Sequence, residues 1–383
     1  MSEPRIALSH DYLNQYGGAE RVVEVFHAMF PDAPVYTSIY DAQSMPPDYR
    51  QWDIRTSFLQ RIPGIHKNHQ PFLPLYPAAF KFLTVDPAYD VLLSSSSAWG
   101  KGVRVDPSVL HICYCHSPMR FAWDFEHYAE RERMDGMSRR VVQPILRRLR
   151  NWDRATSKRV HQFIANSAVV QERIATFWGR QSIVVHPPVD TESFEPAPPS
   201  EIGDYYVLVS RLVPYKRFDL AIEAANSLGI QLKIIGDGRA RADLESMAGP
   251  TVEFLGRVSD AERNQLFARC KAAIFPAEDD FGIGQVEVQA AGRPVIALDR
   301  GGARETVLDG ETGVRFAEQT ASGVADAIRR FEQLTFDPER IVSHASRFSR
   351  ARFEREISRV IDDAYARHTD AAGSPSRVSP GNL

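Results

Sequence analysis

Short apolar runs alternate with longer amphipathic segments along almost the entire chain. Turn residues bound the apolar runs, as they bound buried strands, while the segments between them carry apolar residues at helical spacing. This alternation predicts an α/β protein built from doubly wound parallel sheets. In the first half, strands are predicted at 5–9, 35–39, 91–95, 110–113 and 163–166, with helices near 19–30, 139–159 and 167–177.

A proline-rich segment divides the alternation into two halves. Residues 187–203 contain five prolines and no helix or strand period, so the interdomain linker is predicted at 189–203. A chain of 383 residues also exceeds what one hydrophobic core usually serves. In the second half, strands are predicted at 206–210, 232–235, 252–254, 272–275 and 295–298, with helices near 217–228, 240–247, 259–269 and 285–291.

The end of the chain departs from this alternation. It contains polar helical patterns at 320–333, 338–346 and 350–367 without strands, which are expected to wrap the outside and cross back to the first domain. The last residues are rich in Gly, Pro and Ser and predict a disordered tail. The predicted organisation is a first domain at 1–188, a second at 204–335, helices at 336–368 and the tail at 369–383.

Composition excludes several classes of protein. The net charge of −3 argues against a nucleic-acid binder, so no nucleic-acid partner is predicted. The three cysteines have no CxxC spacing and are expected to be reduced core thiols: Cys113, Cys115 and Cys270. The N-terminal residues resemble no signal peptide, and no apolar stretch approaches the roughly 20 residues of a membrane span. The expected location is the cytoplasm, with the surface of a membrane as a candidate.

The segment 276–295, PAEDDFGIGQVEVQAAGRPV, is the most informative stretch of the sequence. It follows a predicted strand and enters a helix, so it lies at the carboxyl end of a parallel strand, where open α/β sheets bind ligands. The helix start offers free N–H groups and a positive dipole end to a diphosphate. Gly282 and Gly284 allow close backbone approach, and Glu287 is placed to accept hydrogen bonds from ribose hydroxyls. An ordinary strand-to-helix loop with acids at the helix start remains an alternative.

Three other strand ends carry candidate ligand groups. Gly17 and Gly18 precede a helix, where the backbone can approach a phosphate. His116 follows a buried strand, in reach of a sugar hydroxyl in the expected cleft. Arg211 and Lys216 lie on a loop where two cations would neutralise charge developing on a leaving diphosphate. A tight turn, a structural histidine and a solvated basic loop are the respective alternatives.

Other motifs with known chemistry are missing. The chain has no D-x-D triplet and no zinc-type His/Cys spacing, so no metal site and no cofactor are predicted. No G-x-S-x-G, Walker A or G-x-G-x-x-G occurs in its required context, which argues against hydrolases, ATPases and dehydrogenases.

Six motifs in order resemble glycosyltransferase family 4, the retaining enzymes of the GT-B fold. They are GGAE at 17–20, HSP at 116–118, SRLVPYKR at 210–217, IIGDG at 234–238, FLGRVS at 254–259 and DDFGIGQVE at 279–287. The segments RTSFLQRIPG, HICYCHSPMRFAWD and SRLVPYKR are more narrowly similar to bacterial mannosyltransferases of O-antigen and exopolysaccharide assembly. The resemblance covers residues 5 to about 365 and implies two Rossmann-like domains facing across a cleft, with the donor mainly on the second domain and the acceptor on the first.

The resemblance also implies a role for each candidate residue. The glycine pair at 17–18 would contact the donor phosphate, His116 the donor sugar, and Arg211 and Lys216 the diphosphate. The second carboxylate of the family's E-x7-E motif matches Glu287, the ribose ligand. The first falls on Asp279, one methylene shorter than the usual Glu, which places its contact with the donor sugar in doubt. The remaining implied donor-binding residues are Arg257, Phe281, Gly282, Ile283 and Gly284.

The implied activity is a metal-independent, retaining hexosyl transfer. GDP-mannose is the best candidate donor, and a glycan or a polyprenyl-diphosphate-linked sugar is the implied acceptor, as in the assembly of lipopolysaccharide and other surface polysaccharides. In the family, retention is usually explained by front-face attack, in which the leaving diphosphate helps to deprotonate the acceptor hydroxyl. A nucleotide-sugar 2-epimerase of the same fold and a non-catalytic nucleotide-sugar-binding partner in an assembly complex both stay open.

A basic amphipathic pattern at 139–159 bears on the acceptor. Its Arg and Lys residues flank an apolar stripe, which favours contact with an anionic membrane surface such as the cytoplasmic face of the inner membrane. The stripe could equally pack on the first sheet. The basic residues are Arg139, Arg140, Arg147, Arg148, Arg150, Arg154, Lys158 and Arg159, against the single acid Asp153.

Overall fold

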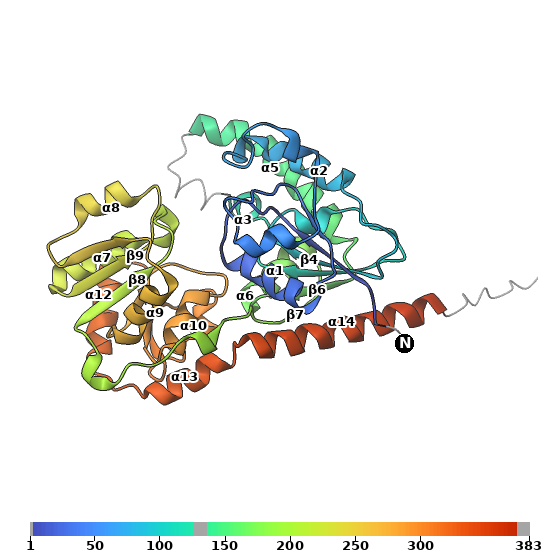
Figure 1. Cartoon of the computed structure of the whole chain (residues 1–383). Coiled ribbons are helices and arrows are strands. Elements are labelled where there is room, and N and C mark those ends of the chain that lie inside the picture. Colours follow the sequence, from blue (N-terminus) through green and yellow to red (C-terminus); the bar gives the residue numbers. More distant parts are fainter. Residues whose placement is uncertain (1–2, 126–135, 374–383) are drawn as a thin grey trace, which may run out of the picture.

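The structure, a computed structural model, describes residues 3–125 and 136–373, with the side chains of 136–141 and 371–373 left out of the description. It contains two parallel β-sheets, each covered by helices on both faces (Figure 1). The predicted fold class, two Rossmann-like α/β domains, is therefore confirmed. Because both faces of each sheet are covered, inner strands such as β1, β4 and β5 are buried along their whole length.

The first domain holds a seven-stranded sheet of order β3-β2-β1-β4-β5-β6-β7. The order reverses between β1 and β4, which makes their carboxyl ends the switch point where ligands bind in such folds. The strands are β1 (Ile6–His10), β2 (Val35–Thr37), β3 (Ile54–Thr56), β4 (Val91–Ser96), β5 (Leu110–Cys115), β6 (Gln162–Ala165) and β7 (Ser182–Val184). The helices are α1 (Gly18–Met29), α2 (Tyr76–Phe82), α3 (Arg120–Trp123), α5 (Gly136–Ser157) and α6 (Ala168–Trp178).

The second domain repeats this plan with a six-stranded sheet of order β10-β9-β8-β11-β12-β13, whose switch point lies between β8 and β11. The strands are β8 (Tyr205–Val209), β9 (Gln231–Ile235), β10 (Val252–Gly256), β11 (Ala273–Phe275), β12 (Val295–Leu298) and β13 (Gly313–Phe316). The helices are α7 (Phe218–Leu228), α8 (Arg241–Met247), α9 (Asp260–Arg269), α10 (Ile283–Ala290), α11 (Ala303–Thr306) and α12 (Ala321–Phe331).

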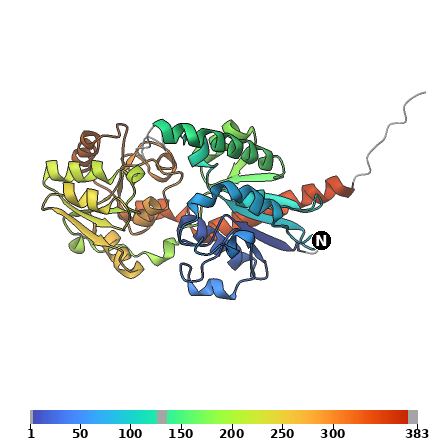
Figure 2. The same cartoon turned by 90° about the horizontal axis from the view of Figure 1, so that it is seen from above.

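Two long C-terminal elements join the domains. Helix α13 (Pro338–Ser346) packs against α10, and α14 (Arg350–Gly373) runs beneath the first domain, as Figures 1 and 2 show. Phe353 of α14 is fully buried and stacks on Phe26 of α1 at a ring distance of 5.6 Å. The linker is bonded to the α13–α14 junction, because Val189 N donates to Phe348 O at 3.0 Å and Arg350 N donates to Val189 O at 3.1 Å. The predicted return of the C-terminal helices to the first domain is confirmed.

Some predicted elements differ from the structure. Strands β3, β7 and β13 were not predicted, because each is a sheet edge of three or four residues, too short to show a period. Residues 369–373 continue α14, so this part of the predicted disordered tail is helical, while 374–383 lie outside the described residues. The predicted linker at 189–203 falls between β7 and β8. All three cysteines are free and buried, as expected.

Candidate functional site

The starts of α1 and α10 meet where the two switch points face each other. A Cβ atom on Gly18 would lie 2.9 Å from Cδ1 of Ile283, so the two domains approach closely here and a side chain at position 18 would displace the end of Ile283. One turn further along each helix, Arg21 Nη1 donates to Glu287 Oε1 at 2.7 Å. Both helices therefore direct their positive N-terminal ends toward one gap, an arrangement that favours an anion.

Three consecutive acids on the loop after β11 each have a cationic partner. Lys216, on the loop after β8, donates to Asp279 Oδ1. Arg173 of α6 reaches across from the first domain, donating to Glu278 Oε1 at 2.8 Å and also to Asp280. These pairs neutralise carboxylates that would otherwise repel one another, and they tie the loop's conformation to contact between the domains.

Arg120 adds a second cation from the first domain. Its Nη1 lies 3.3 Å from Asp280 Oδ1. Burial lowers the pKa of Arg120, but the charges of Asp280, Glu278 and Asp279 together outweigh it and raise that pKa, so the guanidinium stays charged. Sequence reasoning missed both Arg120 and Arg173, because they are far from the acidic loop along the chain. The only available signal was the place of Arg120 directly after the HSP motif.

Two glycines after β12 support the acidic loop from below, and the sequence analysis missed them as well. A Cβ atom on Gly301 would lie 2.2 Å from Asp279 O, and one on Gly302 would lie 2.1 Å from Phe281 O. The Gly302 amide instead donates to Asp279 O at 2.9 Å. A side chain at either position would push the acidic loop out of place. In the sequence, the signal that could have identified these residues was a pair of glycines just after a predicted strand.

Of the remaining donor-site candidates on the second domain, two are glycines within the turn and start of α10 and two are exposed arginines. Gly282 has a φ of 94°, a conformation that favours glycine and turns the chain into α10. Arg211 is exposed and donates to Tyr215 OH at 3.2 Å, on the same loop as Lys216. Arg257 is exposed after β10. Gly284 lies against the ring of Phe275, where an added Cβ would approach to 3.3 Å.

Phe281 lies at the turn into α10. Its side chain is only 3% exposed, and its ring lies 5.4 Å from those of His186 and Phe348. The ring therefore packs in the core beneath the acidic loop. The apolar side chain holds the loop, and only its backbone remains available to a ligand.

His116 lies at the carboxyl end of β5, beside the first switch point. It is partly exposed, and its Nε2 is 2.7 Å from Ser95 Oγ at the end of β4. Burial and the positive charge of His10 lower its pKa to about 3, while the charges of Asp11 and Asp280 act in the opposite direction. His116 is consequently neutral at physiological pH.

Little space remains at the second switch point. The carboxyl ends of β8 and β11 line a cavity of about 10 Å³ that includes Lys216 and Asp279. That volume holds about one water molecule, whereas small-molecule sites are on the order of 300–1,000 Å³. A nucleotide sugar could enter here only if pairs such as Lys216–Asp279 and Arg21–Glu287 separated, which opening of the two domains would allow.

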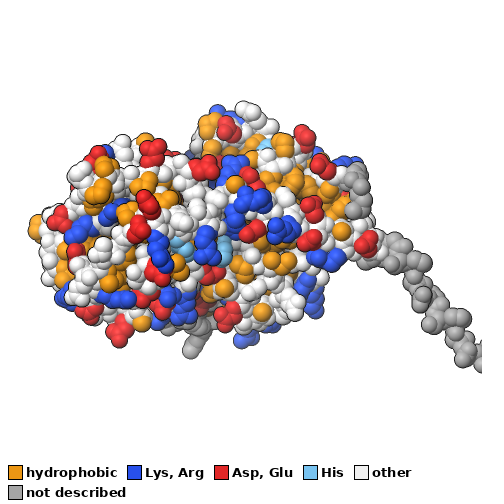
Figure 3. All heavy atoms as spheres, turned by 90° about the horizontal axis from the view of Figure 1, so that it is seen from below, with side chains coloured by type: hydrophobic (Ala, Val, Ile, Leu, Met, Phe, Trp, Pro, Cys, Tyr) orange, Lys and Arg blue, Asp and Glu red, His pale blue; other side chains and the backbone are white. Residues whose placement is uncertain are grey.

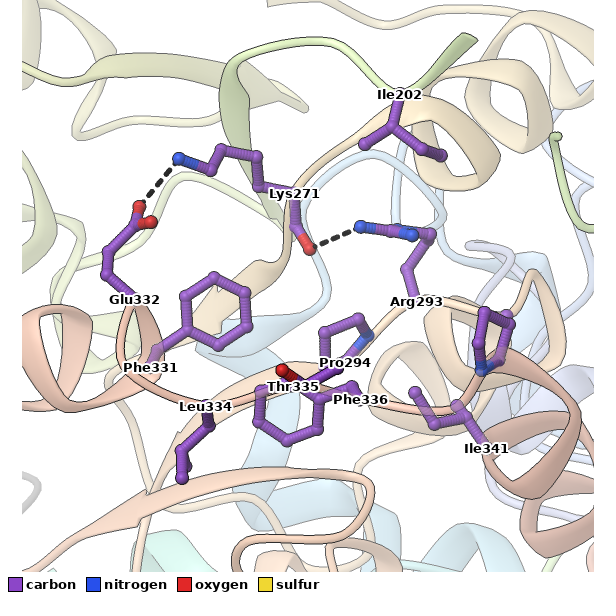
Figure 4. Close-up of a pocket in the computed structure, with 12 residues that line it drawn as sticks. Ile202, Lys271, Arg293, Pro294, Phe331, Glu332, Leu334, Thr335, Phe336 and Ile341 are labelled. Atoms are coloured by element: carbon purple, nitrogen blue, oxygen red, sulfur yellow. Dashed lines mark hydrogen bonds and ion pairs between the residues drawn. The ribbon is translucent and has the colours of Figure 1, made fainter. Parts of the chain in front are cut away.

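A larger cavity, of about 290 Å³, lies elsewhere (Figure 4). It is found at the amino ends of β11 and β12, the opposite edge of the sheet from the switch point. Its cations have partners within the protein: Lys271 pairs with Glu332 at 2.7 Å, and Arg293 donates to the carbonyls of Cys270 at 2.6 Å and Lys271 at 2.9 Å. This cavity is therefore separate from the candidate site.

Two further observations bear on cofactors and membranes. Within residues 3–125 and 136–373, no group of three or more His, Cys, Asp or Glu side chains is arranged to hold a metal ion. Among the same residues, no helix is long and apolar enough to cross a bilayer.

Comparisons with known proteins agree with this geometry. The family described as "Glycosyltransferase Family 4" matches residues 16–193, and "Glycosyl transferases group 1" matches residues 203–333. A D-inositol 3-phosphate glycosyltransferase of Geodermatophilus obscurus is 29% identical over 258 residues, 58% of this chain and 56% of the relative. An uncharacterized glycosyltransferase of Methanocaldococcus jannaschii is 34% identical over 119 residues, 29% of this chain and 34% of the relative. The chain thus spans between a third and just over half of these relatives' length.

A solved structure shows the same arrangement of both domains. It is Anabaena HepE in complex with UDP and glucose, which superposes with a TM-score of 0.71 at 20% identity. The match covers 94% of this chain and 100% of HepE. At this identity the likeness establishes a shared fold.

Proposed function

The chain belongs to glycosyltransferase family 4, and on that basis we propose that it transfers a hexose from a nucleotide sugar to a glycan or lipid-linked sugar, with retention of configuration. One observation carries this proposal: the starts of α1 and α10 converge on a gap that Lys216 and Asp279 border. Two helix N-termini and a cation suit a diphosphate, and a carboxylate beside them suits a sugar hydroxyl.

In this proposal each residue of the site has its own role in donor binding or in transfer. The donor diphosphate lies at the helix starts, where Lys216, joined by the exposed Arg211 side chain, neutralises charge on the departing nucleotide. Glu287, released from Arg21, accepts hydrogen bonds from the ribose, and Asp279 accepts one from the sugar. Because these cations serve the diphosphate, we propose a reaction that needs no metal ion, with front-face attack by the acceptor.

GDP-mannose is the proposed donor, on the strength of the segments similar to mannosyltransferases. The UDP bound by HepE makes UDP-sugars the principal competitors. We expect GDP-mannose at about 100 times its dissociation constant to stabilise the protein by about 2.7 kcal/mol, raising Tm by several degrees in a thermal-shift assay. UDP-glucose and ADP-glucose at the same concentration should raise it less.

The thermal-shift test has a matched pair of variants. Glu287→Gln should reduce the shift, because the ribose loses a charged acceptor, while Glu253→Gln at the exposed sheet edge should leave it unchanged. A larger shift with UDP-sugars would replace the proposed donor, and no shift with any nucleotide sugar would contradict the proposed function. Conversion of the donor without an acceptor would identify a 2-epimerase, and binding without turnover a non-catalytic partner.

We also propose that the acceptor is presented at an anionic membrane surface, which the structure supports in a modified form. Leu146 and Leu149 of α5 are buried in the first domain, so this part of the predicted apolar stripe packs on the protein, while Ile145 of the same stripe is exposed. Arg147 and Arg148 are exposed, whereas Arg150 donates to Ala122 O at 2.6 Å. The side chains of Arg139 and Arg140 lie outside the described residues.

A neighbouring surface supplies exposed apolar groups. Helix α2 packs into the same cluster as α5, at the top of the first domain in Figure 1. Phe82 at the end of α2 is 72% exposed beside the exposed Lys81. Lys and Arg side chains also gather in the middle of the opposite face (Figure 3), so charge alone does not select a surface. The α2–α5 surface is distinguished by exposed large apolar side chains at the start and end of α2 and on α5: Leu75, Phe82 and Ile145.

Vesicle co-sedimentation tests this surface. We expect binding to anionic vesicles at low salt, weaker binding at high salt, and little binding to neutral vesicles, because each cation near lipid contributes about 1 kcal/mol. Phe82→Ser should weaken binding about tenfold, as expected when one aromatic side chain no longer enters lipid. Leu334→Ser, at an apolar side chain that is 38% exposed on the second domain, is the control. Equal and negligible binding to both vesicle types would favour a soluble acceptor.

A further inference from the structure

A row of polar groups crosses the first switch point and ends at His116. The row begins with Glu20 in the first turn of α1, passes through His10 at the end of β1 and Ser95 at the end of β4, and reaches His116 after β5. Adjacent parallel strands β1, β4 and β5 place the last three side by side. Glu20, His10 and Ser95 are at most 4% exposed, so their hydrogen bonds are not shared with bulk water.

The partners of His10 fix its charge. Nε2 lies 3.4 Å from Glu20 Oε1, and Nδ1 lies 3.2 Å from Ser95 O. A carboxylate and a carbonyl can only accept, so both ring nitrogens must carry a hydrogen. Burial lowers the pKa of His10, but the hydrogen bond and charge of Glu20, with the charge of Asp11, outweigh it and raise that pKa. Geometry and electrostatics agree on an imidazolium.

The charge on His10 determines where the Ser95 hydrogen goes. His10 Nδ1 is also 3.1 Å from Ser95 Oγ, so this oxygen accepts from His10 and its own hydrogen remains available. His116 Nε2, at 2.7 Å, is the acceptor within reach. In the described part of the chain, the other ring nitrogen of His116, Nδ1, has no hydrogen-bond partner.

We propose that Glu20, His10 and Ser95 are positioning residues that hold His116 in its neutral tautomer with the hydrogen on Nδ1. The histidine then offers the cleft a fixed N–H donor, suited to an oxygen of the donor sugar or its phosphate, and no acceptor. A protonated His116 would place a second positive charge near the imidazolium of His10, and the opposite tautomer would present a lone pair to ligand oxygens. The use of this donor in transfer rests on the proposed function, whereas the tautomer itself does not.

Histidine ¹⁵N NMR of the full chain without ligand tests the tautomer directly, with His116 assigned by the signal lost in His116→Gln. We expect the Nδ1–H pattern in the wild type from pH 7 to pH 5.5. Ser95→Ala should shift His116 toward the Nε2–H form, and Ser95→Thr, which keeps the hydroxyl, should restore it. An Nε2–H or protonated His116 in the wild type, or no change in Ser95→Ala, would overturn the inference.

A matched control lies on the next residue of the same strand. Ser94 Oγ is 2.9 Å from Nε2 of the buried His111, so Ser94→Ala should alter the His111 signals and leave those of His116 unchanged. Glu20→Gln removes the countercharge of His10, and because the positive charge of His10 lowers the pKa of His116, that pKa should rise in the variant. A His116 titration identical to that of the wild type would contradict the role of Glu20.

The functional readout separates this inference from the proposed function. With a nucleotide sugar that is turned over, Ser95→Ala should lower kcat/KM about tenfold, the scale of one hydrogen bond, and Ser95→Thr should recover most of it. If the tautomer shifts as expected but no nucleotide sugar binds, the proposed function fails while the assignment of the tautomer stands. Unchanged kcat/KM in a Ser95→Ala variant whose tautomer has shifted would overturn the role in transfer.

Discussion

Replacing Lys216 with alanine should lower turnover by about 10² to 10³, the scale of losing one preorganised charge stabiliser. Lys216 stands on the loop after β8 and bonds to Asp279 within the small cavity at the second switch point. Without its charge, the departing diphosphate faces an unpaired Asp279 as well as the acids at 278 and 280. The measurement is the steady-state rate of nucleotide release with saturating donor and acceptor.

A lysine in the same domain supplies the control. Lys233 in β9 pairs with Glu253 at 3.6 Å on the edge of the sheet, so Lys233→Ala should keep wild-type turnover. Thermal unfolding of both variants separates loss of chemistry from loss of folding. Near wild-type turnover in folded Lys216→Ala would reject Lys216 as the cation that stabilises the leaving group.

Asp279→Asn should reduce turnover strongly, by about 10², while leaving the affinity for free nucleotide nearly intact. In the proposed function the carboxylate accepts a hydrogen bond from the donor sugar, and other groups, including Glu287, would bind the nucleotide. Asparagine keeps the shape but loses the charged acceptor, which is worth more than a neutral one. Calorimetry with the nucleoside diphosphate and with the sugar nucleotide, together with turnover, gives the three quantities required.

The shorter side chain at 279 makes this test informative. Arg173 and Arg120 pair with the acids on either side of Asp279, and Gly301 and Gly302 pack directly against the backbone of the loop. These contacts fix the position of the loop, which can therefore bring the shorter aspartate close enough to bond to the donor sugar. Asp326→Asn on exposed α12 is the matched control and should change nothing. If both affinities and turnover are unchanged in Asp279→Asn, the position has no role in transfer.

The sequence alone was sufficient for the architecture. Inner strands of parallel sheets are covered on both faces, so they appear as apolar runs, and strand 295–298 was predicted with the bounds that the structure has. The linker was visible because proline is incompatible with both regular elements. Edge strands such as β3 and β13 escaped prediction because residues with one open side carry a weaker pattern.

The candidate site was likewise predicted in part from the sequence. The sequence analysis found the glycine pair at 17–18, His116, Lys216 and Glu287. Each lies just after a predicted strand, and the carboxyl ends of parallel strands converge on one edge of a sheet. Strand order was needed to put His10, Ser95 and His116 in one row. No local pattern encodes such a row, because its members are separated by long stretches of chain.

Contacts between the domains were decided only by the tertiary structure. The pairs of Arg173 with Glu278 and of Arg21 with Glu287 join residues more than 100 positions apart, on helices whose own sequences give no sign of a partner. The burial of Phe281 likewise depends on the α13–α14 junction, which brings Phe348 against it. Sequence determined which groups stand at the strand ends, through local periodicity. Folding decided which of them meet, because charge pairing and packing across the cleft depend on how the two sheets face each other.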